Sequence, residues 1–170
     1  PRLVANTTKI DQLSYFDAVE LAYSGAQVIH PKTIRPLENK KIPLYVKPFG
    51  EPTAEGSIIT EHAAPINVPV YIWRTNQVLI TLRAKDFAFV LEESLSHIFQ
   101  IIHANRLRVS LIQSSAVTIS VCVDNSRFVA KAIEQLQDAY RVTWNENLRL
   151  LTIRGTTPNI LKQEQQGREI

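Results

Sequence analysis

The side chains best suited to metal chemistry are four histidines and one cysteine, and their spacing argues against a shared site. In the helical pattern that holds them both, His97 and His103 point about 240° apart at ~100° per residue. His30 and His62 have no acidic or cysteine partner at a spacing typical of metal ligands. Cys122 stands alone, which excludes an internal disulfide and a cysteine-based zinc site. We therefore predict no metal-binding residue.

The acidic residues do not suggest an acid–base pair either. Glu92 and Glu93 are adjacent in a helical pattern, so they point in different directions, and the helix dipole favours acidic residues in a first turn. The chain has no Gly-x-Gly-x-x-Gly or Walker pattern that would hold a phosphate, and nothing in it marks a nucleophile. We predict no catalytic residue within these 170 residues.

The stretch "ELAYSGAQVIHP", from Glu20 to Pro31, combines the end of a helix with a turn. Ser14 is a typical N-cap, and Asp17, three residues later, is able to reach back to the free amides. Gly25 is able to adopt the left-handed conformation that ends many helices. These signals predict a helix over Tyr15–Ser24, followed by a short buried strand or extended turn at "AQVI".

The rest of the first half is rich in proline and predicts only short elements. Pro31 or Pro36 opens a second short helix, which turns Ile34 and Leu37 inward. We expect strands at "IPLYVK" and "SIIT", with "PFGEPTAEG" as the loop between them. Residues 61–76 then form a semi-extended linker or an edge strand, because of their prolines.

From residue 77 the pattern changes to regular strands and helices. Strands are predicted at "QVLITLR", "VSLIQS", "VTISVCV" and "YRVTW". One helix carries the apolar stripe from Leu91 to Ile102, and another spans Ser126 to Tyr140. The order β-α-β-β-α-β predicts a four-stranded antiparallel sheet with both helices on one face, the ferredoxin-like arrangement. After it, "LRLLTIRG" and "TPNILKQEQQG" look like the first strand and helix of a second copy.

The uncovered face of this sheet carries Thr118, Ser120 and Cys122, which are small and uncharged. We expect another sheet, subunit or domain to cover it, with a solvated face as the alternative. RNA-recognition domains share this element order, but they stack bases on aromatic residues of the two central strands, and here those strands have none. Positive charges exceed negative ones by only three, and no apolar run is long enough to span a membrane. The sequence thus predicts a soluble, cytoplasmic protein without nucleic-acid or membrane partners.

Residues 1–60 carry the motifs of one known family. The segments "PRLV", "SYFDAVELAYSGAQVIHPKTIRP", "IPLYVK" and "EGSII", in this order and spacing, closely resemble the end of the catalytic domain of aspartate kinases. Residues 77–155 resemble the ACT regulatory domain of that family. The resemblance implies the end of an amino-acid-kinase-type α/β domain over 1–64, a ferredoxin-like ACT domain over 65–147, and a truncated second ACT repeat over 148–170.

Enzymes of this family transfer the γ-phosphoryl group of ATP, with Mg²⁺, to the side-chain carboxylate of aspartate, toward lysine, threonine and methionine. The resemblance implies that Arg2, Ala26, Gln27 and Val28 line the nucleotide site, where the corner at Gly25 lets the backbone approach ATP. Gln27 replaces the lysine usual in the family, and a neutral amide cannot neutralise phosphate charge. The family's phosphate and aspartate motifs lie N-terminal to this stretch, so we expect no kinase activity and no bound cofactor from it alone.

The ACT half implies regulation by an amino acid bound between paired domains. The candidate effector-binding residues come from the loop after the first strand and from the second strand: Lys85, Asp86, Phe87, Ala88, Val90, Ser110, Gln113 and Ser114. Glu93 and Ser110 stand where lysine-binding members have glycine and aspartate, so the ammonium of a lysine effector would lack its charged partner.

Two further expectations concern assembly. We expect self-association through the ACT sheet, as a homodimer. The alternative function is a non-catalytic amino-acid-binding or dimerisation module that has kept a kinase remnant. Whether a homoserine dehydrogenase domain follows in the chain is left open.

Overall fold

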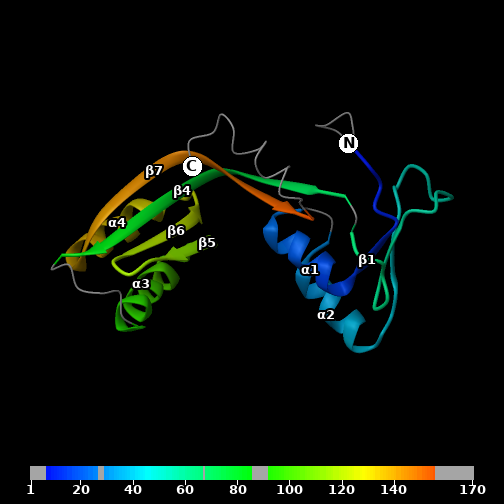
Figure 1. Ribbon diagram of the computed structural model, residues 1–170, viewed down its shortest axis with the longest axis horizontal. Helices are drawn as coiled ribbons and strands as arrows, with labels where there is room; N and C mark the ends of the chain where they lie inside the picture. The colour runs from blue at the N-terminus through cyan, green and yellow to red at the C-terminus, as the bar shows by residue number, and fades with distance from the viewer. Residues whose placement is uncertain (1–6, 27–28, 67, 86–91, 156–170) are drawn as a thin grey trace. The chain divides into compact units, whose positions relative to one another are not determined.

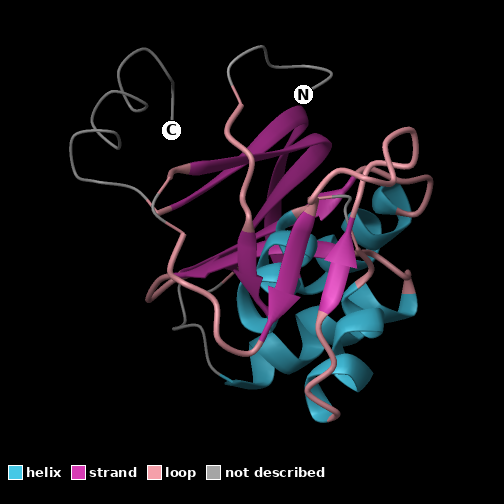
Figure 2. Cartoon of the chain, turned by 90° about the vertical axis from the view of Figure 1, so that its right-hand side faces the viewer, coloured by secondary structure: helices cyan, strands magenta, loops and turns pink. Residues whose placement is uncertain are grey.

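The computed structural model describes residues 7–26, 29–66, 68–85 and 92–155, which form two compact units. The first unit extends to Trp73 and resumes at Leu151, and the second runs from Arg74 to Leu150. Both units mix helices with strands, which are coloured cyan and magenta in Figure 2. The chain enters the second unit within one strand and leaves it within another. The domain boundaries expected after residues 64 and 147 stay a prediction.

Helix α1 (Tyr15–Ser24) begins and ends where the sequence predicts. The Ser14 hydroxyl accepts a hydrogen bond from the Asp17 backbone N–H at 3.0 Å and donates one to the Asp17 carboxylate at 2.6 Å. This carboxylate therefore bonds the capping hydroxyl instead of the free amides that we expected. At the other end Gly25 adopts φ 117°, which a residue with a side chain rarely takes. Both ends of α1 are thus closed by local sequence.

Three short strands form the sheet of the first unit, in the order β1-β3-β2. β1 (Gln12–Ser14) pairs parallel with β3 (Ser57–Thr60), and β2 (Leu44–Val46) pairs antiparallel with it. The strands expected at "IPLYVK" and "SIIT" are confirmed, whereas β1 was not predicted. Helix α2 (Pro31–Asn39) begins at Pro31, so Pro36 lies inside it.

The core of the first unit is small. Ile34 of α2 and Ile59 of β3 are fully buried, and Tyr15 and Ala18 of α1 are buried beside them. The Tyr15 hydroxyl donates to the Ile42 carbonyl at 2.8 Å, which satisfies its polar end at the edge of this cluster. The predicted inward direction of Ile34 and Leu37 is confirmed, because both belong to this cluster.

The sheet of the second unit has the strand order β5-β6-β4-β7. β5 (Val109–Ser114) and β4 (Val70–Ala84) both pair antiparallel with β6 (Thr118–Asp124), and β7 (Tyr140–Arg154) lies on the other side of β4 (Figure 1). Helices α3 (Glu92–Ala104) and α4 (Val129–Ala139) complete the β-α-β-β-α-β order. The predicted ferredoxin-like arrangement is confirmed.

A single aliphatic layer joins both helices to this sheet. Its buried members alternate along β4 and β6 and repeat along α3 and α4: Val78, Ile80, Leu82, Ile98, Ile102, Ile119, Val121, Val123, Val129, Ala132, Ile133 and Leu136. Both helices therefore cover the same face of the sheet, and alternate residues of the strands point to the other face.

Two strands are longer than the sequence patterns predict. β4 begins at Val70 instead of residue 77, and β7 continues through "LRLLTIR", which we expected to be a separate strand. Each contains one residue in the left-handed region, Asn76 at φ 55° and Asn147 at φ 59°. Asparagine tolerates this conformation, and one such residue interrupts the alternation of faces along a strand. The interruption hides the continuity of each strand from a pattern with a period of two.

The ends of the second-unit helices also differ slightly from expectation. Helix α4 begins at Val129 and not at Ser126, because residues 126–128 form a turn in which the Val129 N–H donates to the Ser126 carbonyl at 3.1 Å.

Among the described residues, no helix is long and apolar enough to cross a membrane.

The loop between β2 and β3 generates a prediction about Gly56. This glycine has φ 69°, and a Cβ there would lie 2.3 Å from the Val46 carbonyl oxygen. Gly56→Ala should lower the free energy of unfolding of the first unit by about 2 kcal/mol or more, because the new Cβ would clash with the Val46 carbonyl and alanine is strained at a positive φ. Urea unfolding, monitored through the amide exchange of β2 and β3, measures this change in the free energy of unfolding.

Gly50 provides a matched control in the same loop, since a Cβ there would meet nothing within 4 Å. Gly50→Ala should change the unfolding free energy by only about 0.5 kcal/mol. Equal effects of the two substitutions would show that the turn at Gly56 is not built as described.

Candidate functional site

The corner after α1 leaves the helix in a defined direction. The Gly25 N–H donates to the Ala22 carbonyl at 3.2 Å, and the Ala26 N–H donates to the Leu21 carbonyl at 2.9 Å. These two bonds close the last turn in the manner of a glycine-terminated helix. Ala26 is therefore held at a fixed place relative to α1.

The next helix is capped by a residue that the sequence analysis treated only as a possible metal ligand. The Nδ1 atom of His30 accepts a hydrogen bond from the Lys32 backbone N–H at 3.2 Å, and Pro31 occupies the first helical position. Nδ1 thus acts as an acceptor, so in this arrangement a proton on the ring lies on Nε2. A His-Pro step before an apolar helical pattern is the signal that could have revealed this cap.

The predicted nucleotide residues are described only in part. Ala26 is half-buried at the end of the glycine corner. Arg2, Gln27 and Val28 lie outside the described residues, so their part in a nucleotide site stays a prediction. Neither Ala26 nor Ile29 belongs to a strand, so the described residues of "AQVI" fit the expected turn and not the expected strand.

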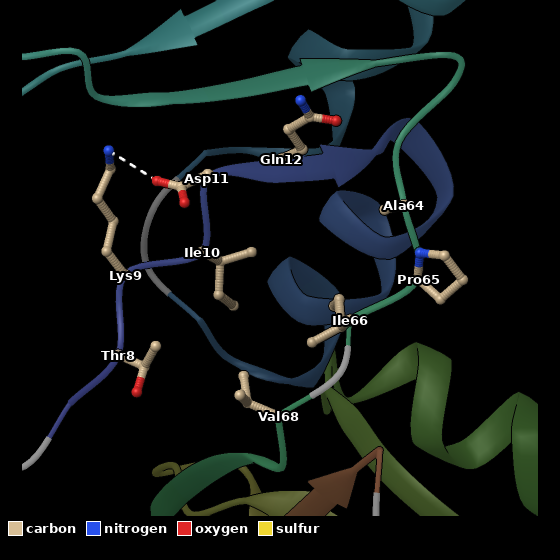
Figure 3. Close-up of a pocket in the computed structure, with 9 residues that line it drawn as sticks. All are labelled: Thr8, Lys9, Ile10, Asp11, Gln12, Ala64, Pro65, Ile66 and Val68. Atoms are coloured by element: carbon tan, nitrogen blue, oxygen red, sulfur yellow. Dashed lines mark ion pairs between the residues drawn. The ribbon is translucent and has the colours of Figure 1, made fainter.

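A surface pocket of about 360 Å³ lies in the first unit, between the segment leading into β1 and the segment after β3 (Figure 3). Its apolar wall includes Ile10, Ile66 and Val68. Lys9 and Asp11, at the left of the close-up, form an ion pair of 2.8 Å. The hydrogen bond from Lys9 to this carboxylate raises the pKa of Lys9. Because the two charges satisfy each other, the pocket offers a ligand mainly apolar surface.

One candidate effector residue already has a partner in the second unit. The Lys85 ammonium donates to the Asp138 carbonyl in the last turn of α4 at 2.8 Å, where the helix dipole favours a cation. Asp86, Phe87, Ala88 and Val90 lie outside the described residues.

The other candidates lie along β5 and are divided between its two ends. Ser110, at an irregularity near the start of β5, accepts a hydrogen bond from Arg74 at 2.9 Å. Gln113 and Ser114, at the end of β5, pair with the start of β6. The start of β6 pairs on its other side with the end of β4, directly before Lys85. Ser110 is four residues from Ser114 on β5, which corresponds to about 13 Å at a rise of about 3.3 Å per residue. The described structure therefore places Gln113 and Ser114, but not Ser110, at the end of the sheet where Lys85 follows β4.

A polar network that the sequence analysis missed occupies the sheet face away from the helices. Gln77 is only 1% exposed, and its Nε2 donates to the Asp124 carboxylate at 2.8 Å and to the Thr75 carbonyl at 3.1 Å. The Arg74 guanidinium, which bonds Ser110, lies 3.9 Å from the same carboxylate. Gln77 and Asp124 are opposite each other in the antiparallel register, so pairing the two predicted central strands would have revealed the contact.

Cys122 adjoins this network and is 5% exposed. Its thiol donates to the Gln77 amide oxygen at 3.6 Å. Burial raises the pKa of Cys122, the charge of Asp124 raises it further, and Arg74 opposes the shift. The thiol is therefore held in its protonated, unreactive form.

Metal ligands do not gather anywhere in the part of the chain that the structure describes. Within it, no three histidine, cysteine or carboxylate side chains come together in a group able to hold a metal ion.

Comparisons with known proteins give the site its context. No family model matches the chain. The lysine-sensitive aspartokinase 3 of Escherichia coli is 30% identical over 129 residues, which cover 74% of this chain and 28% of that protein. The crystal structure of E. coli aspartokinase III with lysine and aspartate matches all of this chain and 41% of its own, with a TM-score of 0.80 at 24% identity.

A second structure of E. coli aspartokinase III, in complex with aspartate and ADP, matches 90% of this chain and 36% of its own, with a TM-score of 0.74 at 26% identity. The chain is homologous to aspartokinases. It spans about a quarter of the length of the E. coli aspartokinase 3 that it matches, with 28% of that sequence covered. The aspartokinase region that shares its fold is the C-terminal ACT regulatory region.

The thiol of this aspartokinase homologue generates a prediction about pH. Because the folded-state pKa of Cys122 is raised, the unfolded chain loses the thiol proton first, above about pH 8.5. The stabilisation is therefore complete below that pH and is lost as the pH rises toward the folded-state pKa. Urea unfolding between pH 7.5 and 10 should show a steeper loss of stability for the native chain than for Cys122→Ala.

Alkylation provides the second readout of the same environment. Iodoacetamide should modify the folded chain at least about 10-fold more slowly than the urea-unfolded chain, because only the thiolate reacts. Equal rates in the two states, or parallel pH profiles for the native chain and Cys122→Ala, would contradict the burial described here.

Proposed function

We propose that this chain is part of an aspartokinase, to which it contributes a wall of the nucleotide site and the ACT regulatory module. The enzyme transfers the γ-phosphoryl group of ATP to the side-chain carboxylate of L-aspartate, in the biosynthesis of lysine, threonine and methionine. The observation that carries the proposal is the 30% identity over 129 residues to E. coli aspartokinase 3. The aspartokinase III structure with aspartate and ADP supports the use of a nucleotide.

The geometry around α1 supports the proposed nucleotide wall. Phosphoryl transfer depends on positioning and on neutralising phosphate charge. The glycine corner holds Ala26 against α1 and leaves its surroundings free of a side chain at residue 25, so the backbone is able to approach a ligand closely. We propose that Arg2, Gln27 and Val28 complete this wall, with Gln27 donating hydrogen bonds without adding charge.

The full enzyme is proposed to use ATP with Mg²⁺. The cation supplies charge neutralisation on the phosphates when it is bound. The described residues include no group of three metal-ligating side chains, so the proposal assigns none of them to Mg²⁺.

The second unit is proposed to bind an amino-acid effector. The structure of aspartokinase III with lysine and aspartate supports amino-acid binding by such an enzyme. In this chain Ser110 already accepts from Arg74, and Lys85 donates to the Asp138 carbonyl. We therefore favour Gln113, Ser114 and the loop that contains Asp86, Phe87, Ala88 and Val90 as the effector-binding part, and lysine is not specifically favoured.

Self-association through the ACT sheet, as a cytoplasmic homodimer, belongs to the same proposal. β5 is an edge strand of its sheet, and its residues Leu111 and Ile112 are 47% and 44% exposed. An exposed edge with apolar side chains favours pairing with another strand. Light scattering should give the mass of a dimer, and a monomer at high concentration would contradict this part. The proposal includes no nucleic-acid or membrane partner.

The activity itself is tested by ADP release. The enzyme that contains this chain should release ADP from ATP only when L-aspartate is present, with D-aspartate as the matched control. The isolated 170-residue chain should release none, because its match covers only 28% of an aspartokinase.

Two outcomes would contradict different parts of the proposal, the first the expected inactivity of the isolated chain and the second the aspartokinase function itself. Aspartate-dependent ADP release by the isolated chain would show that the catalytic residues lie within it. An intact protein that binds lysine or threonine without aspartate-dependent ADP release would instead be the non-catalytic amino-acid-binding module, which the homology does not favour.

A further inference from the structure

An arginine at the end of β7 forms a two-pronged ion pair with helix α1. The Nη2 atom of Arg154 lies 3.4 Å from the Asp17 Oδ1 atom, and its Nη1 atom lies 3.3 Å from the Glu20 Oε2 atom. The guanidinium carbon also lies 6.0 Å from the centre of the Phe16 ring. These contacts join parts of the chain more than 130 residues apart, and Figure 1 shows the end of β7 beside α1.

The arrangement suits the geometry of both partners. Asp17 and Glu20 are three residues apart on α1, so their side chains lie on the same side of the helix. The planar guanidinium has donors on two nitrogens that reach both carboxylates, which a lysine ammonium would do less well. The side chains of Arg154, Asp17 and Glu20 are 27%, 22% and 45% exposed, so water screens the contact less than it screens a fully exposed pair.

Asp17 links this contact to the start of the helix. Its Oδ2 atom accepts from the capping Ser14 hydroxyl at 2.6 Å, and its Oδ1 atom faces Arg154. One carboxylate thus serves the N-cap and the strand at the same time. At the other end of α1, the bond from the Ala26 N–H to the Leu21 carbonyl ties the following segment to the helix. Arg154 is thus bonded to the first turns of the helix whose last turn holds Ala26.

We propose that Arg154 is a positioning residue, which couples the strand leaving the regulatory sheet to the helix that carries the nucleotide wall. The inference rests on the proposed function. β7 begins in the second unit at Tyr140, where it is part of the four-stranded sheet, and its last residue binds α1 in the first unit. Arg154 does not touch the reacting groups; it acts through α1 and Ala26.

The first readout uses the isolated chain and needs no activity. Arg154→Gln should raise the amide exchange rates of α1 about 3- to 5-fold, a size typical of a partly exposed ion pair, with α4 as the unchanged internal reference. Arg149→Gln is the matched control, because Arg149 is an exposed arginine of the same strand for which the described structure gives no ion pair. Arg154→Lys should raise the exchange rates by a smaller factor, because it keeps the positive charge but reaches both carboxylates less well.

The second readout uses the intact enzyme and separates positioning from mere stability. Arg154→Gln should raise the KM for ATP several-fold while kcat and the KM for aspartate stay within about 2-fold, and Arg154→Lys should keep the KM for ATP closer to that of the native enzyme. A purely structural role would reduce the amount of folded, active enzyme and lower the apparent kcat without moving the KM for ATP.

The outcomes distinguish the inference from the function on which it rests. Native enzyme without aspartate-dependent ADP release would refute the proposed function, and the inference with it. Active native enzyme in which Arg154→Gln leaves either α1 exchange or the KM for ATP unchanged would refute the coupling alone.

Discussion

The left-handed backbone of Gly25 is the constraint on which the proposed site depends. It ends α1 and lets the Ala26 N–H return to the Leu21 carbonyl, so the chain that follows starts from a fixed point. A few ångströms decide whether a backbone lines a nucleotide pocket, and a closed helix end provides that accuracy without a large core. The core of the first unit is indeed small, and the Ser14 cap and the Arg154 contact supplement it at the other end and along the side of α1.

The second unit solves a different physical problem. Its helices share one aliphatic layer with β4 and β6, which is enough to define the sheet. The opposite face holds Gln77, Arg74 and Asp124, which are buried or half-buried and bonded to one another. A buried polar network that satisfies its members restricts the strands to one register, because a shifted strand would leave these groups unpaired. The first part of β7 is therefore held in a sheet with a defined register before the strand continues into the first unit.

Local signals allowed much of this fold to be predicted from the sequence. Ser14 and Gly25 mark the ends of α1, and the apolar alternation of β4 and β6 reveals the central strands of the ferredoxin-like unit. The lengths of β4 and β7 could not be predicted, because Asn76 and Asn147 interrupt the alternation although the strands continue through them. Contacts between distant residues, such as Arg154 with Asp17, leave no local pattern at all. Of the proposed nucleotide wall, the described structure covers only Ala26. Of the effector candidates, those on β5 are divided between its two ends.

The most direct test of the proposed nucleotide wall is a crystal structure of the intact enzyme with ADP bound. We expect the backbone of residues 26–28 to lie within hydrogen-bonding or van der Waals distance of the nucleotide, with Gly25 in the same left-handed conformation and Arg154 still bonded to α1. A nucleotide bound elsewhere, with residues 26–28 facing away from it, would show that this segment does not line the nucleotide site.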